Sequence, residues 1–210
     1  MTTRIFIYLF LSFSLSCKQK STDKIVGVVV LNDFEHDYIE GIITNIETYY
    51  KCKCVVLNTI QLPEKCITTL KEKRYRADSI IRYLKSIKPD TVDYILGLTN
   101  ENISNTKYDS LGKIKIPETY FVDISIFGLG FCPGKSCVVS SFNFKNADTI
   151  ITKARLQKIT IHELGHNFGL PHCKSKNCVM QDGAENLELL DESDMKLCEK
   201  CCRRVNKWVR

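Results

Sequence analysis

Three histidines and a glutamate lie within the eleven residues from His162 to His172, and they are the part of this sequence best suited to catalysis. On a helix, His162 and His166 are four residues apart, so both imidazoles project from one face and can hold one metal ion. Glu163 lies about 100° around the helix. There its carboxylate stands beside the metal and can accept a proton from metal-activated water.

The residues that follow this helix can supply a third ligand. Gly169 permits the left-handed turn that ends a helix, and Pro171 resists its continuation. The chain can then bend back and present His172 to the same metal. One histidine alone would be an ordinary surface or core residue, but this joint spacing indicates a zinc site. Three histidines with an open fourth position are typical of catalytic zinc.

A second group of metal-binding residue types follows directly. Its spacing is C-x4-C and C-x2-C, formed by Cys173, Cys178, Cys198 and Cys201. Two close pairs of thiolates suit a closed, structural zinc site. Two disulfides are the alternative in an exported protein, and Cys202 is a rival to Cys201. The segment from about Asp191 to Trp208 is expected to be one helix, which places Cys198 and Cys201 on one face.

The elements that must position these groups predict an α/β fold. Strands are expected at 24–31, 54–57 and 92–98, with crossover helices ending near Tyr50 and spanning 78–87. Asp33 is expected to cap the first helix. This order implies a mainly parallel, mixed sheet, and a further helix starts at Asp148 and carries the histidines. We expect 64–76 to be irregular, 99–125 to be a surface excursion, and 138–142 to be an edge strand that pairs with an extended substrate.

The two metal motifs together resemble the complete archaemetzincin signature. It reads His162-Glu-x-x-His-x-x-Gly169, then Cys173, Cys178, Met180 and Cys198-x-x-Cys201. Looser similarity covers Tyr75-Arg-Ala-Asp and Phe127-Gly-Leu-Gly. The resemblance implies a compact metzincin-like zinc metallopeptidase acting on peptides or proteins. It also implies a catalytic zinc on the three histidines, Glu163 as general base, a methionine turn at Met180 beneath the metal, and a second zinc on the four cysteines.

The N-terminus predicts export. Residues 1–16 hold one cation and an apolar run of eleven residues, which suits a signal peptide and is too short to span a membrane. Cys17 then resembles a lipidation site, residues 17–23 a tether, and residues 24–210 the peptidase domain. The expected location is a membrane-anchored lipoprotein in the periplasm or at the cell surface. Archaemetzincins are generally intracellular, so a cytoplasmic protein is the alternative.

Composition limits the remaining possibilities. The 210 residues carry a net charge of +6, and their 30 basic residues are interspersed with 24 acidic ones. This pattern does not favour a nucleic-acid partner. We expect a monomer. If the protein is exported, Cys132 with Cys137, and Cys66 with Cys52 or Cys54, could form disulfides. The alternatives to a peptidase are a catalytically silent zinc-stabilised binding protein and a zinc hydrolase with a non-peptide substrate.

Overall fold

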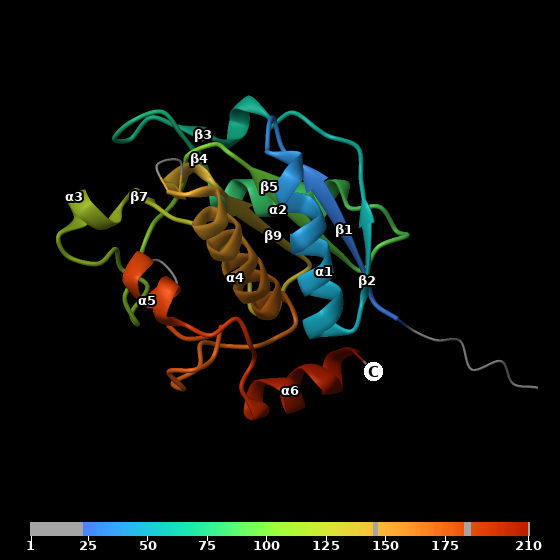
Figure 1. Cartoon of the computed structure of the whole chain (residues 1–210). Coiled ribbons are helices and arrows are strands. Elements are labelled where there is room, and N and C mark those ends of the chain that lie inside the picture. Colours follow the sequence, from blue (N-terminus) through green and yellow to red (C-terminus); the bar gives the residue numbers. More distant parts are fainter. Residues whose placement is uncertain (1–22, 145–146, 183–185, 210) are drawn as a thin grey trace, which may run out of the picture.

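The core of the protein is a five-stranded mixed sheet (Figure 1). The structure is a computed structural model, and it describes residues 23–144, 147–182 and 186–209. The sheet has the order β2-β1-β5-β9-β8. Four strands are parallel, and β8 runs antiparallel to β9. The strands are β1 (Ile25–Val30), β2 (Lys53–Val56), β5 (Tyr94–Thr99), β9 (Ser136–Ser140) and β8 (Gly128–Gly130).

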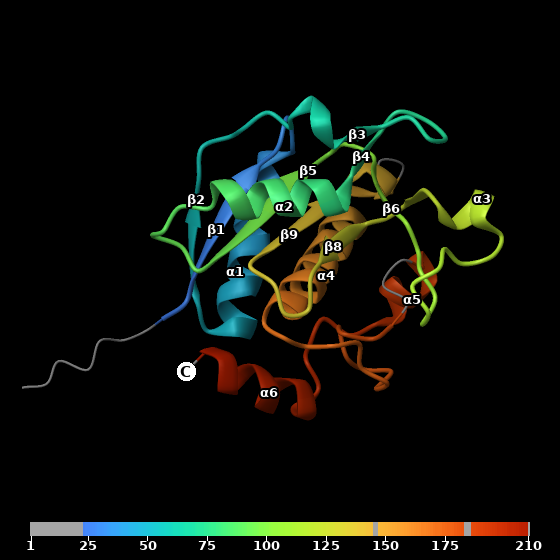
Figure 2. The same cartoon turned by 180° about the vertical axis from the view of Figure 1, so that it is seen from behind.

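Helices cover both faces of this sheet. The helices α1 (Ile39–Tyr50) and α4 (Thr149–Asn167) lie on one face, over a core that includes Tyr50 and Phe168. The helix α2 (Ala77–Ile87) lies on the other face, as seen from behind in Figure 2, and buries Ile80 and Leu84 there. This arrangement confirms the predicted mainly parallel mixed sheet with crossover helices.

A second, smaller sheet occupies segments that we expected to be irregular or on the surface. It has the order β3-β4-β6-β7. Its strands are β3 (Ile67–Thr68), β4 (Arg74–Arg76), β6 (Ile103–Asn105) and β7 (Ile124–Ser125). The expectations for 64–76 and 99–125 were therefore wrong for these strands, whereas 69–73 is irregular and most of 107–122 is exposed as expected. Asp123 next to this sheet is fully buried and pairs with Arg74 and Arg76. Strands of two or three residues are too short to show an alternating pattern.

The edge strand next to α4 is β8 and not the segment 138–142. The strand β9 is paired with β5 on one side and with β8 on the other, and all five of its residues are buried. The expectation of an edge strand there was wrong. Gly128-Leu-Gly130 resembles a loop in the sequence, but it forms a strand by pairing with β9. Its two glycines leave room for α4, which lies too close for side chains at these positions.

The starts of α4 and α1 differ in how well the sequence predicts them. The helix α4 starts where expected, and Asp148 caps it, because its side chain accepts a hydrogen bond from the Ile150 N–H. Asp33 does not cap α1, which begins at Ile39 after a 3₁₀ turn, η1 (His36–Tyr38). Phe34, directly after Asp33, is buried in the core and lies in the non-helical segment before η1. Other short elements are η2 (Glu64–Cys66), α3 (Glu118–Phe121) and η3 (Phe142–Phe144).

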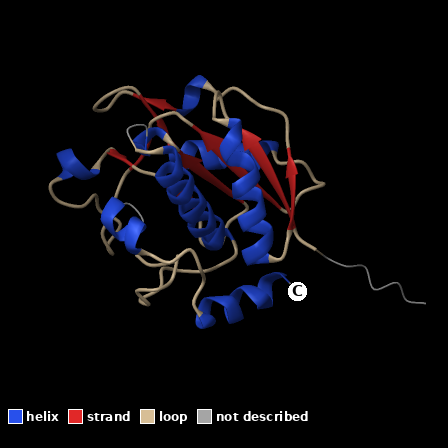
Figure 3. Cartoon of the chain, in the orientation of Figure 1, coloured by secondary structure: helices blue, strands red, loops and turns tan. Residues whose placement is uncertain are grey.

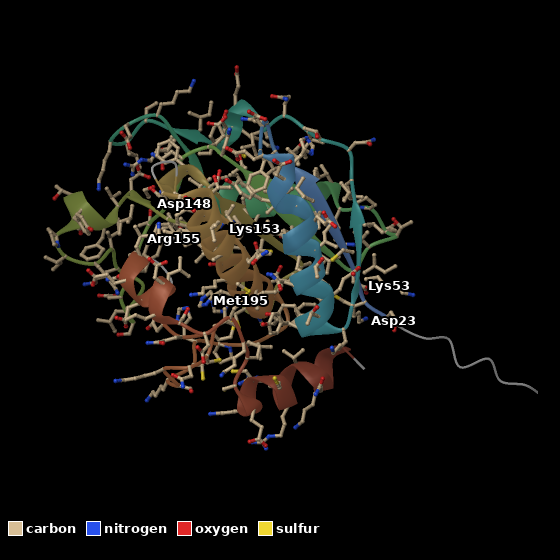
Figure 4. All side chains as sticks on the ribbon, in the orientation of Figure 1. Asp23, Lys53, Asp148, Lys153, Arg155 and Met195 are labelled. Atoms are coloured by element: carbon tan, nitrogen blue, oxygen red, sulfur yellow. The ribbon has the colours of Figure 1, made fainter. Side chains whose placement is uncertain are left out.

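The C-terminal part contains two helices joined by a loop, so the single helix expected from about Asp191 was wrong. They are α5 (Leu187–Glu192) and α6 (Glu199–Val209), and Ser193 between them has an extended backbone. Arg155 of α4, labelled in Figure 4, holds α5 through two hydrogen bonds to Asp191 of 2.8 and 2.6 Å. Figure 3 shows that most of the chain between α4 and α6 is loop.

The expected signal peptide 1–16, the lipidation site Cys17 and most of the tether 17–23 lie outside the described residues. Within the described part of the chain, no helix is both long enough and apolar enough to cross a membrane. The first described residue, Asp23, forms an ion pair of 3.1 Å with Lys53 at the start of β2 (Figure 4).

Candidate zinc centres

The three histidines of the motif meet at one point of the structure. Their potential ligand atoms all lie within 4.8 Å of one another. The Nε2 atoms of His162 and His166 are 3.0 Å apart. Two nitrogen ligands of tetrahedral zinc lie about 3.3 Å apart, given Zn–N distances of about 2.0 Å. The donor set and its spacing therefore fit a zinc ion.

The Nδ1 atom of each imidazole has a polar partner, which orients the ring. His162 Nδ1 donates to the Val179 carbonyl at 2.8 Å, and His166 Nδ1 donates to the Leu170 carbonyl at 2.7 Å. His172 Nδ1 lies 3.3 Å from the Asp182 carboxylate. In the neutral rings of His162 and His166 these bonds leave the Nε2 lone pair for a metal.

Burial keeps two of the histidines neutral. Burial, and then the neighbouring His166, lower the pKa of His162 to about 3. Burial also lowers the pKa of His166 to about 4, against the effect of its hydrogen bond to Leu170. His172 is different, because 49% of its side chain is exposed. The cluster therefore has two buried imidazoles and one that faces solvent, and the buried ones remain unprotonated at neutral pH.

Glu163 lies between the histidines and the edge strand. It is buried and lines the same cleft of 520 Å³ as all three histidines. A Cβ atom at Gly128 would stand 2.7 Å from Glu163 Cγ, and one at Gly130 would stand 2.4 Å from the Glu163 carbonyl oxygen. The two glycines of β8 therefore permit α4 to approach the strand, and this contact holds the carboxylate at the cleft.

The chain beneath the histidines is tightly packed. Met180 is fully buried, and a Cβ atom at Gly165 would lie 2.5 Å from its sulfur. Gly169 has φ of 78°, the left-handed conformation expected at the end of this helix. The Tyr50 hydroxyl donates to the Ile161 carbonyl and thereby joins α1 to α4. These contacts fix the helix that carries the two buried histidines.

The four motif cysteines also converge, and all four sulfurs lie within 4.8 Å of one another. The Sγ atoms of Cys173 and Cys198 are 3.7 Å apart, and those of Cys178 and Cys201 are 3.8 Å apart. Sulfur ligands of tetrahedral zinc lie about 3.8 Å apart, whereas disulfide sulfurs lie about 2.0 Å apart. The sulfur distances therefore fit a tetrathiolate metal site and are too long for the two alternative disulfides.

The remaining described cysteines are not joined in disulfides either. All ten cysteines in the described part of the chain are free. Cys66 belongs to the core under α2 and Cys52 to the core under α1, so the sheet separates them. Cys132 is exposed at the cleft while Cys137 is buried in β9. Cys202, the rival ligand, instead donates to the Leu197 carbonyl and is not part of the cluster.

Two residues of the cleft and one at the end of α4 were not identified from the sequence. Asp182 contacts His172. Lys107 lines the cleft from the segment after β6. Asn167 donates to the carbonyls of Phe131 and Ser136 and fixes the β8–β9 turn to the end of α4. For Asp182, the sequence signal was an acidic residue shortly after Met180, which is too common a feature to predict a contact with His172.

Comparison with known proteins gives the same class of protein as the site. The family model described as peptidase family M54 matches residues 26–207. The archaemetzincin of Methanopyrus kandleri is 33% identical over 150 residues, which are 71% of this chain and 75% of that protein. The archaemetzincin of Saccharolobus solfataricus is 24% identical over 186 residues, 89% of this chain and 95% of that protein.

Solved structures share the fold. The crystal structure of Methanopyrus kandleri archaemetzincin superposes with a TM-score of 0.72 at 23% identity and covers 90% of this chain and 97% of that one. The Archaeoglobus fulgidus archaemetzincin gives 0.66 at 21% identity and covers 86% and 99%.

The fold, the histidine cluster and these relatives together define a zinc-dependent metallopeptidase. Within that class, the chain belongs to peptidase family M54, the archaemetzincins.

Proposed function

We propose that His162, His166 and His172 hold the catalytic zinc and that Glu163 is the general base of peptide-bond hydrolysis. The observation that carries this proposal is the convergence of three oriented imidazoles in a cleft that Glu163 also lines. When bound, zinc lowers the pKa of a coordinated water and polarises the scissile carbonyl. Glu163 would take the proton of this water and deliver it to the leaving amine.

The substrate would lie along β8. This strand pairs with β9 on one side, and among the described strands none pairs with its other side. An extended peptide could add to this edge by backbone hydrogen bonds, with its scissile bond above Glu163. We therefore assign to β8 the pairing with substrate that we expected for 138–142. Asn167 supports this arrangement because it holds the turn at the end of the strand.

The four cysteines would hold a second, structural zinc, giving two zinc ions per chain. Their sulfur spacing supports this proposal. The four thiols differ in acidity, because burial raises the pKa of Cys178 and of Cys201. Burial raises the pKa of Cys198, but hydrogen bonds from the Cys201 backbone and the neighbouring thiols outweigh it and lower the pKa to about 7. One thiol of the group is thus readily ionised, as a zinc ligand must be. Met180 would form the methionine turn beneath the catalytic metal.

For the whole chain we propose a monomeric peptidase domain at 24–210 without a nucleic-acid partner. A signal peptide at 1–16 would be removed, and Cys17 would carry the lipid at the start of the tether 17–23. The protein would then be an exported, membrane-anchored lipoprotein, with the cytoplasm as the alternative location. Labelling of cells with a palmitate analogue, compared between the native chain and a Cys17→Ala variant, tests this part of the proposal.

Replacing Glu163 by alanine tests the catalytic role. We expect kcat on fluorogenic peptides to fall by about 10²- to 10⁴-fold, because general-base assistance contributes this much. Zinc content should not change, since Glu163 is not a ligand in this proposal. Glu192→Ala, at an exposed position of α5, is the matched control and should cleave as the native protein does. Unchanged cleavage by Glu163→Ala would contradict the proposal, and a zinc-loaded native protein that cleaves no peptide would favour the silent binding protein.

A further inference from the structure

A second cavity, of 360 Å³, adjoins the catalytic cleft, and Pro171 and His172 line both. It lies between the chain that follows α4 and the start of α6. Figures 1 and 2 show α6 crossing the end of the molecule at which α4 ends. Three cations line the cavity: Lys174, Lys200 and Arg204. Among the described residues that line it, none is an aspartate or a glutamate.

The positions of these cations on α6 favour binding of an anion from outside the helix. Lys200 and Arg204 are four residues apart, so they share one face of α6, and both are exposed. Like charges at this spacing repel each other and weaken a helix. The acidic residue of the same turn, Glu199, pairs instead with Arg203, which does not line the cavity. An incoming carboxylate would relieve this repulsion.

The positive charge of Arg204 acts on a residue of the catalytic cleft, Cys132. Cys132 lines that cleft next to the end of β8. Burial raises the pKa of the Cys132 thiol, and the positive charge of Arg204 lowers it. Arg204 is therefore close enough to act electrostatically on a residue of the substrate cleft. Together with the two lining residues that the cavities share, this makes the second cavity an extension of the cleft on the side of Pro171 and His172.

We propose that this cavity is a substrate subsite that binds an acidic side chain of the peptide, with Lys174, Lys200 and Arg204 as its carboxylate-binding residues. The inference rests on the proposed peptidase function and specifies acidic peptides as the preferred substrates. Arginine suits this role because its guanidinium binds a carboxylate through two parallel hydrogen bonds. Leu170 and Pro171 provide an apolar wall for the methylene groups of the same side chain.

The same three cations could instead balance the negative charge of the four-cysteine zinc site, and this role must be distinguished from substrate binding. Four thiolates around one zinc ion carry a net negative charge, and Cys173, Cys198 and Cys201 also line the cavity. If the cations served only to balance this charge, removing them would release zinc or lower the melting temperature. It would leave the choice of peptide unaltered. Zinc content and peptide selection must therefore be measured on the same variants.

The test uses the zinc-loaded protein and a neutral fluorogenic peptide into which one aspartate is placed at each position around the scissile bond in turn. On one side of that bond, aspartate should lower KM. Arg204→Ala should raise KM for this peptide by about 2- to 5-fold and leave the neutral peptide unaffected, as expected for one partly exposed ion pair. Removing all three cations should raise it by about 10-fold, and added salt should reduce the difference. Arg203→Ala, the neighbouring residue paired with Glu199, is the matched control and should retain the preference.

Two outcomes would overturn the inference while the peptidase function stands. Either aspartate lowers KM at no position, or Arg204→Ala alters zinc content without altering peptide preference. If the native protein cleaves no peptide, the proposed function fails, and binding then decides the inference alone. In that case, fluorescence anisotropy with Glu163→Ala protein should show the acidic peptide bound more weakly after Arg204→Ala than after Arg203→Ala. Equal binding to the two variants would overturn it.

Discussion

The histidine cluster and the cysteine cluster are neighbours in the chain, since His172 is followed directly by Cys173, yet they suit different tasks. The histidines come mainly from a buried helix and open into a cleft of 520 Å³. The cysteines come from a loop and the start of α6, and their four sulfurs lie within 4.8 Å of one another, enough ligands to fill a tetrahedral zinc site. An open position permits chemistry, whereas a closed one can only hold the chain together.

Removing one buried residue from each cluster should have the largest effects and should show whether the two clusters differ in task. His166→Ala should abolish cleavage and lower the zinc content by one ion per chain. Cys178→Ala should remove the other zinc and lower the melting temperature by about 10 °C or more, because loss of a structural metal costs several kcal/mol of stability. His166→Ala should lower it less, since α4 is packed against the sheet without metal. Zinc analysis and thermal unfolding of both variants check this, and equal destabilisation would show that the two sites do not differ in task.

Adding one methyl group at the edge strand should separate catalysis from zinc binding. In Gly128→Ala the new Cβ would stand 2.7 Å from Glu163 Cγ and 2.9 Å from Ile159 Cγ2. We expect kcat to fall by about 10-fold or more while zinc content stays the same, because small displacements of a catalytic group cost this much. Gly41→Ala on α1 is the control, since its Cβ would meet the flexible side chains of Gln157 and Lys153 (Figure 4). Full activity in Gly128→Ala would show that β8 does not position Glu163.

The smallest expected effect is on the pH dependence of stability without metal. Burial lowers the pKa of His162 to about 3 and that of His166 to about 4, against about 6.5 in the unfolded chain. Between pH 6.5 and 4 the unfolded chain therefore binds protons that the folded protein does not, so stability falls as the pH falls. Urea unfolding of metal-free protein at pH 7 and pH 4.5 measures this. The double variant His162→Ala/His166→Ala should lose less stability across this interval, and an identical loss would contradict the assignment.

The sequence predicts the histidine site well because, on a helix, the spacing of two residues determines whether their side chains lie on the same face. Residues four apart share a face on any helix, so His162 and His166 could be placed together without knowledge of the fold. The parallel sheet was predictable for a similar reason, since continuous β-branched runs such as that before Leu31 indicate buried strands.

The surroundings of the site could not be predicted in this way. The short strands β3, β4, β6 and β7 are defined by their partners and not by a pattern of their own. Gly128 and Gly130 form an edge strand because they pair with β9, and glycine is needed there because α4 packs against them, which is a tertiary contact. Asp182 reaches His172 only because the chain folds back beneath the helix. Each of these features depends on residues far away in the sequence.

Anomalous diffraction at the zinc absorption edge, from crystals of the zinc-loaded protein, can locate both proposed zinc ions and show whether the histidine site has an open fourth position. We predict two peaks per chain. One should lie between the Nε2 atoms of His162, His166 and His172 with no fourth protein ligand, and the other should lie at the centre of the four cysteine sulfurs. A histidine site without zinc, or one whose fourth position is filled by a protein atom, would contradict the account.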